Sequence, residues 1–379
     1  MDFALTEEQS AIFEMAREFA MENIAPNAIE WDQAKHFPLD VIKQTAELGM
    51  AGIYTRDDIG GSDLTRLDAA LIFEALSHGC PATASFLSIH NMCSWMIDTF
   101  GAEEMRQKWG PKLTSMETVA SYCLTEPGSG SDAAALKTTA KRDGENYVLK
   151  GTKTFISGGG VSDLYIVMAR TGEAGPKGIS AFLIEKGTPG LSFGANEKKM
   201  GWNVQPTTEV VMDDVVIPAS NLLGNEGDGF KYAMKGLDGG RLNIAASALG
   251  AAQAALDKTL SYMSERKAFG KSINQFQALQ FRLADMEIEL QAARVFLYKA
   301  AWTYDQGLPE GTKYCAMAKR FVTDTAFEVA NQALQLHGGY GYLADYGIEK
   351  IVRDLRVHQI LEGTNEIMRL IVSRQLLSE

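Results

Sequence analysis

The stretch Leu361-Glu362-Gly363-Thr364-Asn365-Glu366-Ile367, close to the C-terminus, places one carboxylate on a glycine-backed turn. Apolar residues precede Glu362, and a run with helical spacing begins at Glu366, so Thr364 or Asn365 is expected to cap a helix. An apolar wall raises the pKa of a carboxylate, which suits a general base that removes a proton from carbon. On this stretch alone, an ordinary loop glutamate is the alternative.

Two stretches far upstream add to this pattern. Tyr122–Asp132 (YCLTEPGSGSD) contains two glycines, a proline and three hydroxyl residues, so its backbone N–H groups could approach a ligand closely. A polar turn between two strands is the alternative for this loop. Lys153–Gly160 (KTFISGGG) reads as a strand that ends in a flexible turn.

With Glu265–Gly270 (ERKAFG) and Gln335–Tyr342 (QLHGGYGY), these stretches form five motifs in a fixed order. In this order and spacing the chain resembles the acyl-CoA dehydrogenase family over essentially its whole length. The resemblance implies an α+β fold of three domains: an N-terminal helical domain over residues 1–119, a middle β-barrel-like domain over 120–226, and a C-terminal four-helix-bundle domain over 227–379.

The hydrophobic pattern agrees with this division. Apolar residues recur at helical spacing before residue 119, and Thr6 and Gln9 have the spacing of a capping box. Between 120 and 226, short β-branched and aromatic runs alternate with Gly, Pro and Asp turns. Long helical patterns follow over 245–264, 279–304 and 314–336. No G-x-G-x-x-G follows a strand and opens a helix, so a Rossmann fold is not expected.

Composition excludes several classes of protein. The net charge is −12, whereas a nucleic-acid-binding protein normally carries a basic surface, so this class is excluded. The sequence contains no run of about 18 apolar residues, so no membrane span is expected. The four cysteines form no C-x-x-C pair, and the five histidines lack metal-ligand spacing, so no metal is expected. The N-terminus resembles neither a signal peptide nor an Arg-rich presequence, which favours a bacterial cytoplasmic or a processed mitochondrial matrix protein.

The resemblance implies a reaction, α,β-dehydrogenation of an acyl-CoA. Glu362 would remove the α-proton while the β-hydrogen leaves as hydride to N5 of FAD. Hydrogen bonds from the backbone N–H of Glu362 and a ribityl hydroxyl of FAD would stabilise the enolate. Some family members carry the base at the position of Gly240, which has no side chain here, so Glu362 is the candidate that is left.

The resemblance also assigns the binding residues. Arg266 would pair with the FAD diphosphate, although a solvated helix end is its alternative, and Phe276, Gln277 and Gln335–Gly339 would reach the FAD of an adjacent subunit. Phe155 would form an aromatic wall, with a β-core phenylalanine as its alternative. Arg374 would contact CoA, or lie free on the surface. The full set of expected FAD contacts is Tyr122, Leu124, Thr125, Gly130, Ser131, Phe155, Ile156, Ser157, Arg266, Phe269, Phe276, Gln277, Gln335, Leu336, His337, Gly338, Gly339, Thr364, Asn365 and Glu366. The expected substrate contacts are Ser131, Asp238, Gly239, Gly240, Arg241, Leu361, Gly363 and Arg374.

Two departures from the family pattern bear on the substrate. Leu361 stands where a tyrosine is common, and Phe155 where a tryptophan is common. Both changes favour a short branched acyl group, isobutyryl-CoA of valine degradation, over butyryl- or 2-methylbutyryl-CoA. The expected partners are electron-transfer flavoprotein and further copies of the chain, in a homotetramer built as a dimer of dimers. An acyl-CoA oxidase and a helical scaffold without activity are the competing functions.

Overall fold

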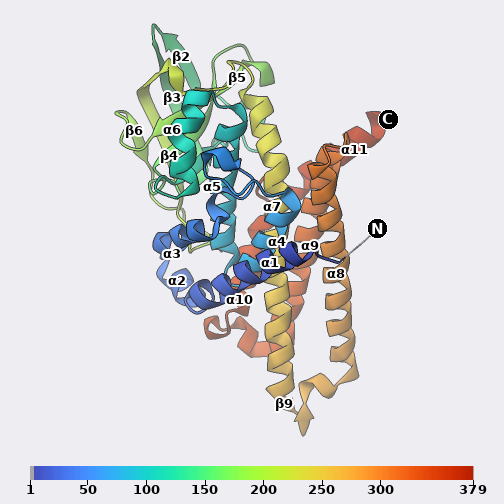
Figure 1. Cartoon of the computed structure of the whole chain (residues 1–379). Helices are drawn as coiled ribbons and strands as arrows, with labels where there is room; N and C mark the ends of the chain where they lie inside the picture. Colours follow the sequence, from blue (N-terminus) through green and yellow to red (C-terminus); the bar gives the residue numbers. More distant parts are fainter. Residues whose placement is uncertain (1–3, 379) are drawn as a thin grey trace.

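The apolar spacing of the first 119 residues produces six α-helices in the computed structural model, which describes residues 4–378 (Figure 1). They are α1 (Glu7–Phe19), α2 (Ala28–Ala34), α3 (Leu39–Gln44), α4 (Arg66–Ser77), α5 (Pro81–Phe100) and α6 (Glu103–Thr114). The predicted capping box of α1 is present, because the Gln9 N–H donates to Thr6 Oγ1 at 3.1 Å and the Thr6 N–H donates to Gln9 Oε1 at 3.2 Å.

The β-branched runs of the middle region form one sheet with the order β6-β7-β3-β2-β4-β5-β8, and β1 pairs with β4. Its strands are β1 (Ala120–Cys123), β2 (Thr139–Asp143), β3 (Asn146–Ser157), β4 (Leu164–Arg170), β5 (Ile179–Glu185), β6 (Leu191–Phe193), β7 (Thr207–Pro218) and β8 (Leu222–Leu223). The β1–β4 pair is parallel, whereas β3–β7 and β4–β5 are long antiparallel pairs. The β-branched and aromatic runs of the sequence at 147–149, 165–168, 179–184 and 209–212 lie inside β3, β4, β5 and β7 respectively.

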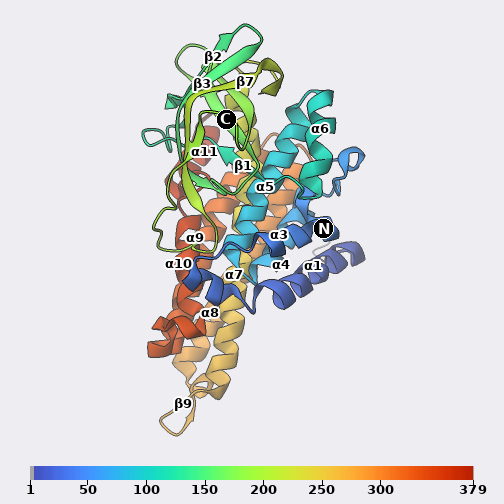
Figure 2. The same ribbon diagram turned by 90° about the vertical axis from the view of Figure 1, so that its left-hand side faces the viewer.

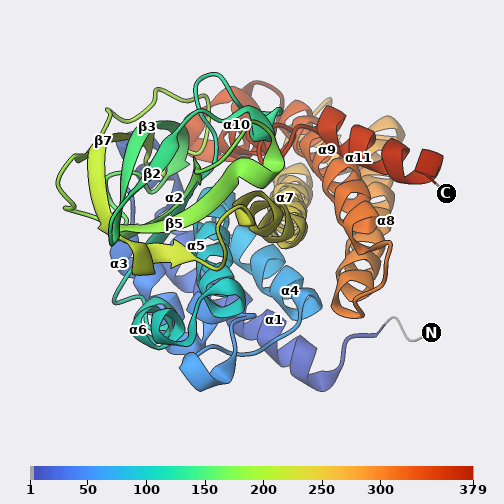
Figure 3. The same ribbon diagram turned by 90° about the horizontal axis from the view of Figure 1, so that it is seen from above.

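Long helices make up the rest: α7 (Gly229–Glu265), α8 (Gln277–Asp305), α9 (Gly311–His337), α10 (Ile348–His358) and α11 (Asn365–Ser378). A hairpin of β9 (Lys267–Ala268) and β10 (Lys271–Ser272) joins α7 to α8. The sheet stands at one end of the helices and this hairpin lies at the other end (Figure 2). From above, α7, α8 and α9 run together beside the sheet (Figure 3). The predicted α+β architecture is confirmed. No helix within residues 4–378 is long and apolar enough to cross a membrane.

The hydrophobic cores cross the expected domain boundaries. One cluster joins α1, α4 and α5 to α7, α8, α9 and α10, and a second joins α5 and α6 to β4, β5 and α7. Helix α7 is common to both clusters, and it begins at Gly229, where the helical pattern of the sequence returns after the β-region. The three parts of the chain are therefore packed around one long helix.

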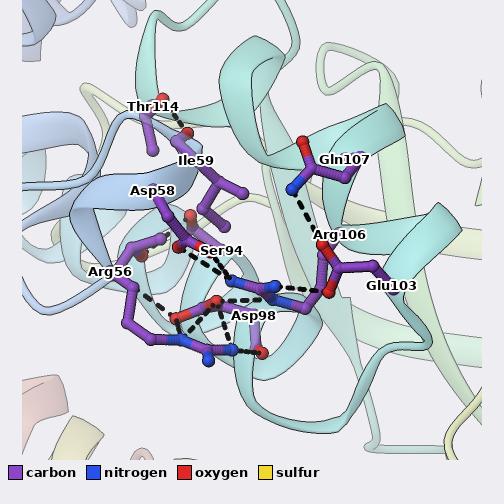
Figure 4. A network of polar contacts seen from close by, with 10 residues as sticks. Arg56, Asp58, Ile59, Ser94, Asp98, Glu103, Arg106, Gln107 and Thr114 are labelled. Carbon is purple, nitrogen blue, oxygen red and sulfur yellow. Dashed lines mark hydrogen bonds and ion pairs between the residues drawn. The ribbon is translucent and has the colours of Figure 1, made fainter.

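A polar network fastens the end of α5, the helix that supplies one wall of the cavity described below (Figure 4). The Arg106 guanidinium reaches three carboxylates, Asp58 at 2.8 Å, Asp98 at 2.9 Å and Glu103 at 2.6 Å. Arg56 adds a 2.8 Å ion pair to Asp98, whose side chain is almost fully buried. The network ties the segment 56–59 and α6 to α5, so this wall has a rigid support.

Candidate active site

The predicted base, Glu362, lies in the turn between α10 and α11. Its backbone is in the left-handed region with φ 52°, and Gly363 follows with φ 93°. Arg241 on α7 donates from Nε to the Glu362 carbonyl oxygen at 3.3 Å. Thr364 Oγ1 accepts the Ile367 N–H at 3.3 Å, so Thr364, rather than Asn365, supplies the capping side chain of α11. The turn directs the Glu362 side chain at α7.

The Glu362 carboxylate faces Gly240 on α7. A Cβ atom added to Gly240 would lie 2.3 Å from Glu362 Oε2 and 3.0 Å from Glu362 Cδ. These distances are shorter than van der Waals contact, so a side chain at position 240 would compete with the carboxylate for the same volume. The two positions that the family offers for the base are therefore neighbours in space, although 122 residues separate them in the chain.

Burial raises the pKa of Glu362 to about 7, while the positive charges of Arg241 and Lys319 act in the opposite direction. Glu362 Oε2 is buried and has no hydrogen-bond partner among residues 4–378. A carboxylate without partners is disfavoured in its charged form, which makes this group a stronger base than an exposed glutamate. The Tyr122 hydroxyl nearby is also buried and, within the same range, has no partner.

A buried ion pair that the sequence analysis did not single out holds the loop after β1. Lys153 Nζ donates to Glu126 Oε1 at 2.7 Å and to the Leu124 carbonyl at 3.1 Å. Glu126 also accepts the backbone N–H groups of Lys137 and Thr138 at 2.6 and 2.9 Å. Both residues lie inside motifs quoted from the sequence, but nothing in the sequence indicated that they pair, because Lys153 shares its strand with a second lysine, Lys150, which is exposed.

Phe155 leaves the sheet through a β-bulge. The β3–β7 register shifts between Lys153 and Ile156, and Phe155 itself has φ 57°. Bulges re-aim side chains next to active sites, and here the phenyl ring is 66% exposed on a cavity wall. The alternative reading, a phenylalanine in the core of the sheet, is therefore wrong.

The bulge, the loop and the base line one cavity with a volume of about 1240 Å³. Its walls come from α5, β1 and its loop, β3, α7, and the α10–α11 turn, and most of the surface is apolar. Of the predicted site residues, the cavity brings together Tyr122, Leu124, Thr125, Gly130, Ser131, Phe155, Ile156, Ser157, Arg241, Leu361, Glu362, Gly363, Thr364 and Arg374.

A second hollow of about 650 Å³ lies near the hairpin, where α7 and α9 end and α8 begins. It collects the other predicted cluster, namely Arg266, Gln335, Leu336, His337, Gly338 and Gly339. Arg282 lines it too and was not predicted. An added Cβ at Gly338 or Gly339 would meet no atom within 4 Å, so the backbone there is open to a ligand.

The remaining predicted residues lie outside both hollows. The Asp238 carboxylate accepts hydrogen bonds from Arg241 at 2.6 Å and from Thr312 at 2.7 Å. Gly239 packs on Arg66. Asn365 is buried against α9, while Glu366 is exposed. Phe269, Phe276 and Gln277 lie on or just after the hairpin, with the Phe269 ring 95% exposed and 6.1 Å from the Phe276 ring. The binding roles of these residues stay predictions.

These residues fit the chemistry of a flavin nucleotide. The first cavity offers an exposed aromatic face, Phe155, beside the hydroxyl residues Thr125 and Ser157. The second offers the guanidinium groups of Arg266 and Arg282 beside open glycine backbone, which suits a diphosphate. The two hollows share no lining residue, so the chain presents the two halves of such a site separately.

Three family domains match the sequence in order. The acyl-CoA dehydrogenase N-terminal domain matches residues 6–117, the middle domain 121–215 and the C-terminal domain 227–377. A curated relative, the mitochondrial isobutyryl-CoA dehydrogenase of Bos taurus, is 53% identical over 375 residues, which cover 99% of this chain and 90% of the relative.

Solved structures agree over the full length. Butyryl-CoA dehydrogenase from Megasphaera elsdenii is 39% identical and superimposes with a TM-score of 0.96, covering 100% of both chains. A chain from work on the electron transferring flavoprotein of Acidaminococcus fermentans is 44% identical with a TM-score of 0.97, again covering 100% of both chains.

Proposed function

Because the chain belongs to the acyl-CoA dehydrogenase family, we propose that it oxidises a short branched acyl-CoA, isobutyryl-CoA, with Glu362 as the base. The family makes the protein a flavin-dependent oxidoreductase whose cofactor is FAD. The observation that carries the base assignment is the buried, unpaired Oε2 of Glu362, which lies on the wall of the large cavity and faces Gly240.

The reaction breaks two C–H bonds. Glu362 accepts the α-proton, and the β-hydrogen leaves with its electron pair, so the acyl-CoA becomes an α,β-unsaturated thioester. FAD, when bound, supplies the acceptor for that hydride. A thioester α-proton is weakly acidic, so a base with a pKa near 7 is better matched to it than an ordinary glutamate.

Stabilisation of the enolate needs a donor beside the base. No hydrogen bond from the Glu362 N–H is found among residues 4–378, so this group is available for the thioester oxygen. The N–H and the carboxylate belong to the same residue, and the left-handed backbone of Glu362 fixes how the two groups are oriented in the turn. One residue would thus both remove the proton and stabilise the charge that develops.

The test of the base is Glu362→Gln, which keeps the shape and removes the proton acceptor. We expect normal FAD content and a loss of turnover of about two to four decades. Glu328→Gln, an exposed carboxylate on α9, is the matched control and should retain normal turnover. Retention of more than about a tenth of the activity by Glu362→Gln would refute the assignment.

The substrate proposal is supported by the 53% identical relative and by two wall residues. Isobutyryl-CoA branches at the carbon that loses the proton, so the cavity must widen beside Glu362. Leu361, directly before the base, and Phe155 both line the cavity. We expect the highest kcat/KM for isobutyryl-CoA, measurable activity on 2-methylbutyryl- and butyryl-CoA, and little on octanoyl-CoA, because one methyl group is worth only about 1–3 kcal/mol of discrimination.

Leu361→Tyr tests this reading directly. The larger ring should lower kcat/KM for isobutyryl-CoA more than for butyryl-CoA, because only isobutyryl-CoA is branched at the α-carbon, the carbon that loses its proton to Glu362. A wild-type preference for butyryl- or octanoyl-CoA would remove the isobutyryl assignment and its place in valine degradation, but would leave Glu362 as the base.

We further propose electron-transfer flavoprotein as the electron acceptor. Support comes from the relative named after a dehydrogenase and from the structural neighbour found in work on an electron transferring flavoprotein. The alternative is an oxidase, in which O₂ reaches the reduced flavin. Anaerobic reduction with substrate followed by air should leave the flavin reduced for minutes; immediate reoxidation with peroxide release would identify an oxidase.

The active form is proposed to be a homo-oligomer, a dimer of dimers. Helix α8 exposes large apolar side chains at a seven-residue interval, each of them at least half exposed: Phe281, Ile288, Val295 and Trp302. Seven residues are two helical turns, so these side chains form one stripe suited to another helix. The cysteines are buried free thiols, which agrees with a reducing compartment, the bacterial cytoplasm or the mitochondrial matrix.

A further inference from the structure

We propose that Lys319 on α9 is a positioning residue for the catalytic base, because it fixes the turn that carries Glu362 and places a positive charge beside it. This inference rests on the proposed role of Glu362. Lys319 belongs to none of the motifs of the sequence and does not line the cavity. Its role follows from where its ammonium group lies.

The Lys319 ammonium group binds the turn itself. Its side chain is fully buried, and Nζ donates to the Gly363 carbonyl and to Asn365 Oδ1, both at 2.9 Å. Asn365 is held in turn, since its Nδ2 donates to Asp324 Oδ1 at 2.7 Å and to Thr323 Oγ1 at 3.0 Å. Side chains of α9 therefore hold the residues on the C-terminal side of the base.

Arg241 holds the other side of the turn from α7. Its Nε donates to the carbonyl of Glu362, while Lys319 takes the carbonyl of the next residue, Gly363. A non-glycine residue with φ 52°, such as Glu362, keeps this backbone only where its surroundings determine it. Arg241 of α7 and Lys319 of α9 bind the consecutive carbonyls of Glu362 and Gly363, and these two contacts supply that constraint.

A lysine with only a structural role usually pairs with a carboxylate when it is buried. Lys319 forms no ion pair within 4 Å among residues 4–378, and both of its acceptors are uncharged. The charge of Lys319 is therefore not neutralised by a direct partner. Among the carboxylates around it, Glu362 has the largest effect on the pKa of Lys319. Burial lowers the pKa of Lys319 to about 7, with the charge of Glu362 acting against this.

The charges around the pair come from several elements. Glu362 faces Arg241 of α7 and Lys319 of α9, and its charge is also felt by the hydroxyls of Tyr54 and Tyr122. Arg241 of α7, Asp324 of α9 and Glu366 of α11 also act on Lys319, and the pKa of His358 on α10 is lowered by burial and, in turn, by the charge of Lys319. Within residues 4–378, removal of Lys319 leaves Arg241 as the cation that acts directly on Glu362, so the carboxyl should hold its proton to higher pH.

The experiment uses the FAD-loaded protein with isobutyryl-CoA and compares Lys319→Met with Thr323→Val. Both changes weaken the same hydrogen-bond network, but only the first removes a charge. We expect Lys319→Met to lower kcat about tenfold or more with a much smaller change in KM, and to move the acid limb of the kcat–pH profile up by about one unit. Thr323→Val should leave the limb at its wild-type pH.

The outcomes separate the two proposals. A wild-type kcat and pH profile for Lys319→Met, alongside an inactive Glu362→Gln, would overturn the role of Lys319 alone. Retention of more than about a tenth of the activity by Glu362→Gln would instead overturn the base assignment. If Lys319→Met fails to fold or to bind FAD, Lys319→Gln keeps an N–H donor without the charge and should show the same upward shift. An unshifted limb in that variant also overturns the proposal.

Discussion

Gly240→Ala offers the sharpest test of how closely the base is confined. The new methyl group would stand 2.3 Å from Glu362 Oε2, whereas ordinary contact begins at about 3.4 Å. The carboxylate would have to retreat by roughly 1 Å, the difference between these distances. Because a misplacement of about 1 Å costs about a hundredfold in rate, we expect kcat to fall by about two decades, or about 2.7 kcal/mol of transition-state stabilisation.

The fold should tolerate this change. Alanine is favoured over glycine inside a helix by about 1 kcal/mol, and position 240 lies in the middle of α7. A normal or raised Tm with normal FAD content would therefore separate a displaced base from a damaged protein. Gly236→Ala, one turn earlier on α7, is the matched control, because its added Cβ would meet Met92 and Met96 at an ordinary 3.4 Å.

A second variant distinguishes the mechanism from a general packing defect. Glu362→Asp shortens the base, so Gly240→Ala should cost much less in the Asp background than in the wild type, and the two changes should be non-additive. In the complementary exchange, Gly240→Glu should partly restore turnover to Glu362→Gln, because both positions face the same volume. Gly240→Ala with more than half of the wild-type kcat, or with an equal loss in Gly236→Ala, would refute the reasoning.

Three further outcomes are expected. Arg266→Ala should weaken FAD retention about ten- to a hundredfold, since a charge-assisted hydrogen bond is worth about 1.5–3 kcal/mol; full flavination after extensive dialysis, equal to that of the exposed neighbour variant Lys267→Ala, would contradict this. Glu362→Gln should raise the Tm relative to wild type at pH 8 but not near pH 5. With a folded pKa of about 7 against an unfolded value of 4.5, the native carboxyl keeps a proton that the unfolded chain loses, so wild-type stability declines as pH rises between these values; a Tm difference independent of pH would count against the burial argument. Ile288→Glu should reduce the apparent mass in sedimentation, whereas Glu289→Gln should not; an unchanged oligomer would show that the α8 stripe is not an interface.

Local patterns in the sequence were sufficient for much of the architecture. Helical spacing and the Thr6–Gln9 capping box predicted the N-terminal helices, and β-branched runs predicted the strands. These features depend on residues within one or two turns of one another, so they can be read without the fold. The pairing of a glycine-backed Glu362 with a Gly240 that lacks a side chain was also visible, through the resemblance to the family.

Tertiary structure decided what those residues do. Gly240 and Glu362 compete for one volume only because α7 passes beneath the α10–α11 turn. Phe155 faces the cavity because of a β-bulge, a one-residue shift of β3 against β7. The pattern of apolar and polar residues in β3 did not predict this shift.

Lys319 shows the limit most clearly. In the sequence it is one lysine in a helical run, and a solvated helix face would be its ordinary environment. The fold buries it and directs its ammonium group at the Gly363 carbonyl, 44 residues later in the chain. The sequence determines which side chains carry a charge. The electrostatic effect of that charge on a neighbouring group depends on distance and on the exclusion of water, and tertiary packing determines both.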